Sequence, residues 1–180
     1  MKRAPVRGAI RGAAAGLALL ALAGCSTASA PPVACPKVGL LGDTARLVAF
    51  APGGDSIRDV IVEGAVTGVK GACRYDSSRR QVRMAVTVQI TGREGPAYQG
   101  GGVDLPFFVA VVTRDERILA KSVFQSRLTF GNQMLAAKTE DMATEIPIAP
   151  GATPADYRVM VGFQLTPAQL DYNRHHAAPH

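Results

Sequence analysis

The sequence contains no tryptophan and only three histidines, and all three histidines stand within the last six residues. Serine and cysteine hydrolases need a histidine base held within hydrogen-bond reach of the nucleophile, which a chain terminus does not provide. Histidines and carboxylates are also missing at metal-ligand spacing around the cysteines. Asp55, Asp59, Glu63 and the pair Glu140-Asp141 are better explained as solvated surface than as a paired acid and base. We therefore expect no catalytic residues, no metal and no cofactor, and thus no enzyme.

Runs of lysine and arginine are absent beyond the first part of the chain. The whole chain has 20 Lys and Arg against 14 Asp and Glu, but four of the basic residues precede Cys25, which leaves 16 against 14. A nearly balanced charge provides no positive surface for the phosphates of a nucleic acid. We therefore expect no nucleic-acid partner.

Hydrophobic runs long enough to cross a membrane are missing as well. The apolar run over residues 13–23 is too short to span a bilayer as a helix. It follows the basic residues Lys2, Arg3, Arg7 and Arg11 and ends in small residues. This order of a basic region, an apolar region and small residues is typical of an export signal.

The end of that segment, Leu22-Ala23-Gly24-Cys25, resembles the lipobox of bacterial lipoproteins. The resemblance implies that residues 1–24 are a leader that is removed, and that Cys25 is lipidated and anchors the mature protein to a membrane. An ordinary signal peptide cut near Ala28 or Ala30 is the alternative. In such lipoproteins an aspartate after the lipidated cysteine signals retention in the inner membrane. Ser26 therefore favours the outer membrane, with the protein facing the periplasm.

Lipidation of Cys25 would leave two cysteines, Cys35 and Cys73. An exported chain with two remaining cysteines most often pairs them, so we expect a disulfide. It would close a loop of about 39 residues and stabilise the fold by roughly 4 kcal/mol on chain-entropy grounds. Residues 25–34 are small and proline-bearing, which predicts a flexible tether. One domain is expected to follow over residues 35–174.

Alternation of apolar and polar residues with a period of two dominates this domain, which indicates β-strands with one buried face. The strongest strands are expected over residues 82–90, 118–130 and 157–165, and weaker ones over residues 46–50, 103–113 and 145–148. Between Asp59 and Tyr75 the apolar phase shifts by one residue at Gly68. Such a shift indicates a β-bulge or a strand break.

About seven short strands with few helical patterns predict an all-β fold, an antiparallel β-sandwich. Residues 151–161, with Tyr157 at the start of a strand, resemble the corner between strands E and F of immunoglobulin-like and fibronectin-type-III-like domains. In those domains the tyrosine hydroxyl bonds back to the preceding loop. The resemblance implies an immunoglobulin-like sandwich. The chain departs from antibody domains because it lacks the strand-C tryptophan and has Val159 where they carry their second cysteine.

One short helix is expected at the C-terminal end of the domain. Thr166 suits the N-cap, Pro167 suits the first helical position, and Gln169 completes a capping box. The helix should end at about Asn173. Residues 175–180, which include the histidines, are expected to form a disordered tail.

The segment over residues 103–113 is apolar on both faces of the predicted strand. Its outward residues and those of the following strand form one apolar outer face, made of Phe108, Ala110, Val112, Leu119 and Val123. A strand that is apolar on both sides is usually covered. Either the C-terminal helix, through Leu170 and Tyr172, or the N-terminal segment lies across this face, or the face docks another envelope protein.

Three segments of the chain are similar to small envelope lipoproteins of Gram-negative bacteria: residues 35–39, 73–76 and 161–166. The likeness implies no particular activity. The function we expect is a non-enzymatic binding or assembly module, held at the outer membrane by lipid on Cys25 and facing the periplasm. A structural or stress-protective lipoprotein without a dedicated partner, and a carrier of a small apolar ligand, are the alternatives.

Overall fold

Eight strands and one α-helix form within residues 34–176, the part of the chain that the computed structural model describes. The predictions on the leader, on Cys25 and on most of the tether lie outside the described residues. In chain order the strands are β1 (Lys37–Leu40), β2 (Arg46–Phe50), β3 (Val60–Tyr75), β4 (Gln81–Glu94), β5 (Gly102–Thr113), β6 (Ile118–Thr129), β7 (Leu135–Pro147) and β8 (Tyr157–Phe163). The helix is α1 (Pro167–His176), and three 3-10 turns are η1 (Gly42–Thr44), η2 (Ile57–Asp59) and η3 (Pro154–Asp156).

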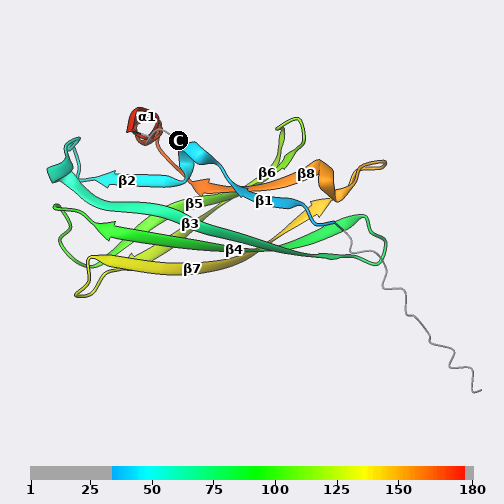
Figure 1. Ribbon diagram of the computed structural model, residues 1–180, viewed down its shortest axis with the longest axis horizontal. Coiled ribbons are helices and arrows are strands. Elements are labelled where there is room, and N and C mark those ends of the chain that lie inside the picture. Colours follow the sequence, from blue (N-terminus) through cyan, green and yellow to red (C-terminus); the bar gives the residue numbers. More distant parts are fainter. Residues whose placement is uncertain (1–33, 177–180) are drawn as a thin grey trace, which may run out of the picture. The chain divides into compact units, whose positions relative to one another are not determined.

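The strands form two four-stranded sheets (Figure 1). The β5 sheet has the order β1-β8-β5-β6, and the β4 sheet has the order β2-β3-β4-β7. Neighbouring strands are antiparallel except β1 and β8, which run parallel. The predicted all-β class, with mostly antiparallel sheets and a short C-terminal helix, is confirmed. The number of strands and the parallel pair differ from the prediction, because β1 is too short for a period-two pattern to reveal it.

A single hydrophobic core lies between the two sheets, and alternate residues of each central strand supply it. On β4 the alternate residues from Val82 to Ile90 are each at most 1% exposed. The opposing β5 sheet contributes the alternate residues of β8 from Tyr157 to Phe163 and of β5 from Leu105 to Val111. The predicted core faces of residues 82–90 and 157–163 are therefore confirmed.

The phase shift in the first long strand is a β-bulge rather than a strand break. β3 continues through it, and its pairing with β4 skips one residue, Thr67, between Val66 and Gly68. A Cβ atom at Gly68 would lie only 2.7 Å from Oε1 of Gln89 on β4. A glycine beside the bulge therefore gives the Gln89 side chain room to lie across β3.

Strands β6 and β7, each the last strand of its sheet, depart from the predicted pattern of buried and exposed residues. The first half of β6 is exposed, with Ile118 at 61%, and only Leu128 and the following Phe130 are buried in the core. β7 begins at Leu135 instead of residue 145. Its first ten residues are mostly exposed, and their apolar and polar side chains do not alternate, so no hydrophobic pattern marks them as a strand. Both are edge strands, where burial no longer follows from alternation alone.

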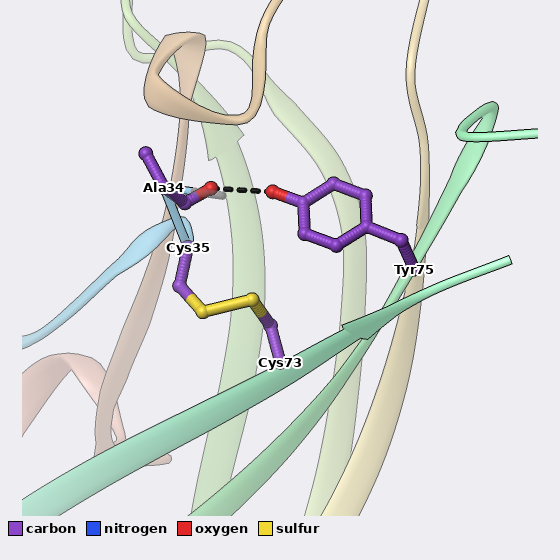
Figure 2. Close-up of a disulfide and its surroundings, with 4 residues drawn as sticks. All are labelled: Ala34, Cys35, Cys73 and Tyr75. Carbon is purple, nitrogen blue, oxygen red and sulfur yellow. Dashed lines mark hydrogen bonds between the residues drawn. A yellow bond between two sulfur atoms is a disulfide. The ribbon is translucent and has the colours of Figure 1, made fainter. Parts of the chain in front are cut away.

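The predicted disulfide between Cys35 and Cys73 is present and links the two sheets (Figure 2). The bridge spans 38 residues of sequence and joins the segment before β1 to the end of β3, with Cα atoms 5.7 Å apart. Beside it, the Tyr75 hydroxyl donates a hydrogen bond to the carbonyl of Ala34. Ala34 and Cys35, at the start of the domain, are thus both linked to the end of β3.

The C-terminal helix has the predicted N-terminus but a later end. The Thr166 amide donates to Oε1 of Gln169 at 2.9 Å, and the Gln169 amide donates to the Thr166 hydroxyl at 3.2 Å, which confirms the capping box. The predicted end near Asn173 and the tail from residue 175 are corrected, since α1 includes His175 and His176. The reason is tertiary: the His176 ring stacks on Tyr172 at 4.1 Å, and Tyr172 packs on Phe50 of β2.

Candidate functional site

The five residues predicted to form an apolar outer face do not share one environment. Phe108, Ala110 and Val112 alternate with core residues of β5 and are 6%, 3% and 8% exposed. Leu119 and Val123 of β6 are 43% and 51% exposed. The outer face of the β5 sheet is therefore covered over β5 and open over β6.

The cover over Phe108 comes from η1, which lies directly on β8. A Cβ atom at Gly162 would overlap the Thr44 hydroxyl and would lie 3.2 Å from the Phe108 ring. The Thr44 hydroxyl donates to the Leu41 carbonyl at 2.9 Å, which fixes this turn. On the other side, Nζ of Lys121 lies 4.6 Å from the centre of the Phe108 ring. The absence of a side chain at Gly162 thus allows η1 to approach the sheet.

The α1 helix closes one end of the same face. Leu170 lines the cavity described below, whereas Tyr172 packs on Phe50 and away from it. Both predicted covers, the helix and the N-terminal segment, therefore contribute, although the expected role of Tyr172 is wrong.

The helix α1 lies near β2 (Figure 1), and side-chain hydrogen bonds hold it against η1 and β2. The side-chain nitrogen Nε2 of Gln169 donates to the Val48 carbonyl at 3.1 Å. Asn173 donates to the carbonyls of Asp43 and Arg46 at 2.9 and 2.8 Å. These bonds therefore hold the helix both to β2, the edge strand of the β4 sheet, and to the turn η1.

A cavity of about 410 Å³ remains between these covers, and we call it the β5–β8 groove. Its floor follows three cross-strand pairs of β5 and β8: Phe108 with Gly162, Ala110 with Met160, and Val112 with Arg158; all of these residues line the cavity except Gly162, on which Thr44 lies. Leu41, Leu165 and Leu170 line the end beside the first pair, and Glu116 and Ile118 line the end beside the third. The floor of the groove is mostly apolar; Arg158 and Glu116 lie at one end, and Nζ of Lys121 lies over Phe108 towards the other.

The charged end contains an arginine that is not fully paired. Nη2 of Arg158 lies 3.5 Å from Oε1 of Glu116, which stands in the turn between β5 and β6 with a φ of 64°. Nε of Arg158 is buried and has no hydrogen-bond partner among the described residues. Within residues 34–176, Lys121 forms no ion pair. The groove therefore presents two cationic groups and one carboxylate.

The carboxyl groups with a lowered pKa are Asp59, Asp76, Asp115 and Asp156; none of them lines the groove, although Asp115, whose pKa is lowered by a hydrogen bond with Thr113, adjoins Glu116. Hydrogen bonds from the Ser56 hydroxyl and amide hold the pKa of Asp59 below its usual value, and the Ser78 hydroxyl does the same for the pKa of Asp76. The Thr153 amide and hydroxyl lower the pKa of Asp156 in η3. Asp76 is exposed and Asp59 and Asp156 are half-buried; all three are acceptors in local turns.

The described residues offer no candidate metal site and no candidate membrane span. Residues 34–176 hold no cluster of three or more histidine, cysteine or carboxylate side chains that could bind a metal ion. In the same part of the chain, no helix is long and apolar enough to cross a membrane.

The sequence pattern identified the apolar floor of β5, and Leu170 as a residue over it, but missed the residues of the charged end and of β8. Arg158, Met160 and Glu116 join Ala110 and Val112 only because β8 and the β5–β6 turn lie beside β5. The only sequence signal for Arg158 and Met160 is their place on the outward face of β8, which gives no information about the neighbouring strand.

Comparison of the chain with known proteins gives no match to a protein-family model, to a curated protein or to a solved structure. The function is therefore argued from the residues and their geometry.

Proposed function

We propose that this chain is a lipid-anchored envelope protein that binds another molecule in the β5–β8 groove and catalyses no reaction. The observation that carries the binding function is the groove itself, an apolar cavity of about 410 Å³ with a charged end on the outer face of a sheet. Cavities of about 300 to 1,000 Å³, mostly apolar with a few placed polar groups, are typical of ligand sites.

The anchor and the location form the second part of the proposal. Leu22-Ala23-Gly24-Cys25 resembles a lipobox, and Ser26 favours the outer membrane over the inner one. The disulfide between Cys35 and Cys73 supports an oxidising compartment such as the periplasm. Ten residue steps separate Cys25 from Cys35, so lipid on Cys25 would keep the domain within about 35 Å of the membrane.

We further propose that the domain is related in architecture to fibronectin-type-III-like and immunoglobulin-like sandwiches. In such domains one sheet contains strands in the order A-B-E and the other contains C′-C-F-G. Strands β3, β4 and β7 match A, B and E, and strands β6, β5 and β8 match C′, C and F. The position of strand G is occupied by β1, which runs parallel to β8.

The corner tyrosine supports the same assignment. Tyr157 is the first residue of β8, the strand that matches F, and is 4% exposed. Its hydroxyl accepts a hydrogen bond at 3.0 Å from the amide of Ala149, in the loop between β7 and β8. A tyrosine at the start of strand F that bonds back to the preceding loop is a feature of immunoglobulin-like domains.

The anchor is tested by metabolic labelling with palmitate and by membrane fractionation. We expect the wild-type protein to incorporate palmitate and to sediment with outer membranes, and Cys25→Ala to do neither. A wild-type protein without acyl chains would overturn the anchor.

Binding is tested by photo-crosslinking in cells. A photoreactive amino acid replaces Ile118, which lines the groove and is 61% exposed, or Ile57, which is 75% exposed and does not line it. We expect an adduct from position 118 that disappears with Ala110→Leu, which fills the floor of the groove. The control Ala143→Leu, on an exposed position of β7, should preserve the adduct. Equal adducts from positions 118 and 57, or none from position 118, would contradict binding in the groove.

A further inference from the structure

We propose that the ligand of the β5–β8 groove is a single-chain anionic amphiphile, a medium-chain fatty acid bound as its carboxylate. The carboxylate would lie at Arg158, and the alkyl chain would extend over Met160 and Ala110 towards Phe108 and Leu170. This inference rests on the binding function proposed above and specifies its ligand.

The floor of the groove changes from charged at Arg158 to apolar at Phe108, as an amphiphile requires, and above Phe108 lies the Nζ of Lys121. The three pairs of its floor follow one another at intervals of two residues along β5 and β8, so the floor extends about 13 Å from the Arg158 pair to the Phe108 pair. Arg158 and Glu116 mark one end, and Leu41, Leu165 and Leu170 mark the other. A ligand with one charged end and an unbranched apolar body matches this order.

Arg158 supplies a donor that the protein leaves unused. Its Nε is buried without a hydrogen-bond partner among the described residues, and buried polar atoms are rarely left so. The contact of its Nη2 with Glu116 is 3.5 Å, longer than the usual charge-assisted hydrogen bond of about 2.7 to 2.9 Å. A guanidinium group binds a carboxylate through two parallel N–H donors. The Arg158 side chain is 41% exposed, so a ligand carboxylate would compete with Glu116 for its accessible Nη groups, and a rotation of the guanidinium group would be needed to bring Nε into the same contact.

The backbone of the floor favours an alkyl chain over a peptide strand. β8 is paired with β1 on one side and with β5 on the other, and β5 is paired with β8 and β6. The floor therefore offers side chains but no free strand edge, which an added peptide strand would need for its hydrogen bonds. An alkyl chain needs only apolar contact, such as that provided by Ala110, Met160 and Phe108.

The test is calorimetric titration of the full-length chain carrying Cys25→Ser, so that no acyl chain of its own is present. The probes are dodecanoate, octanoate and dodecan-1-ol, each below its aggregation concentration. We expect one dodecanoate per protein, and octanoate should bind at least about tenfold more weakly because four buried methylene groups are missing. Absence of dodecanoate binding would overturn the inference.

Two substitutions at the charged end should act in opposite directions. Arg158→Gln should weaken dodecanoate binding about tenfold and leave dodecan-1-ol binding unchanged, because only the carboxylate needs the guanidinium group. Glu116→Gln should strengthen dodecanoate binding severalfold, because it removes the competing carboxylate. Glu116 stands in an exposed turn, so this variant should fold even if others do not. Weaker or unchanged dodecanoate binding by Glu116→Gln would contradict the proposed place of the head group.

A further pair of variants tests the groove itself. Ala110→Leu should abolish binding of both dodecanoate and dodecan-1-ol, and Ala143→Leu should change neither.

The two experiments distinguish an error in the proposed ligand from an error in the proposed binding function. If dodecanoate does not bind but the adduct at position 118 persists and contains a protein, the fatty-acid inference is wrong and the binding function stands. If both are absent, both are wrong.

Discussion

Strands β4 and β5 differ in how many of their faces are buried, although each lies in the middle of its sheet. On β4, buried and more exposed residues alternate along almost the whole strand. On β5, the six consecutive residues 107–112 are all buried. The outer face of β4 is open to solvent, whereas the outer face of β5 is covered by η1 and α1 and contains the groove. Apolar residues on both faces of a strand thus marked the place where other elements lie on the sheet.

The largest effect is expected on the inner face of β4. Val86→Asp would bury an unpaired carboxylate in the core, where Val86 is 1% exposed, and should lower the free energy of unfolding by at least about 4 kcal/mol. Its neighbour Ala85 is exposed on the other face, so Ala85→Asp should change this free energy by less than about 1 kcal/mol. Urea denaturation measures both. Equal losses for the two variants would mean that β4 does not have one buried and one open face.

Removal of the disulfide tests how much this link between the two sheets contributes to stability. Replacing both Cys35 and Cys73 by serine should lower the free energy of unfolding by roughly 4 kcal/mol, because the bridge closes a long loop in the unfolded chain. Amides of β1 should also exchange with solvent faster, since β1 is then held by its pairing with β8, by side-chain packing and by the hydrogen bond from Tyr75 to Ala34, without a covalent link. The reduced wild-type protein is the matched control and should behave like the double variant. A loss below about 1 kcal/mol would show that the bridge contributes little to stability.

Alanine substitutions at Phe107 and Phe108 compare the inner and outer faces of β5 at adjacent positions. Phe107 is in the core and 1% exposed, so Phe107→Ala should lower the free energy of unfolding by about 4 kcal/mol. Phe108 lies under η1 and Lys121 beside the groove, and because that side is incompletely packed, Phe108→Ala should lower it by about 2 kcal/mol. Truncation after Thr166, which removes α1, should reduce the effect of Phe108→Ala but not that of Phe107→Ala. An unchanged stability of Phe108→Ala would indicate that the outer face contributes only to binding.

The smallest expected effect concerns the contact between η1 and β8. Gly162→Ala would place a Cβ atom into Thr44 and should lower the free energy of unfolding by about 1 to 2 kcal/mol. Gly39→Ala is the control, since its Cβ atom would lie 4.0 Å from the Met160 sulfur, an ordinary contact. Thermal unfolding of both variants gives the comparison. If Gly162→Ala is as stable as Gly39→Ala, η1 is not held closely on the sheet.

Several features of the fold could be predicted because they depend on residues close together in the chain. The alternation from Val82 to Ile90 determines which face of β4 is buried, and the Thr166 and Gln169 pair determines where α1 begins. The disulfide between Cys35 and Cys73 followed from the expectation that Cys25 carries the lipid. Each of these conclusions needed only a local pattern or the small number of cysteines.

Other features required the pairing of distant segments. The sequence alone showed that Phe108, Ala110 and Val112 form an apolar outer face, but not which elements cover it. Arg158 lies beside Val112 because β8 returns to pair with β5 after β6 and β7, and the parallel strand β1 then completes the sheet. Local hydrophobic patterns report burial but not the identity of the neighbour, because many strand orders bury the same faces. The sequence by itself therefore determined the core and the apolar outer face, and only the tertiary structure decided that this face forms a groove with a cationic end.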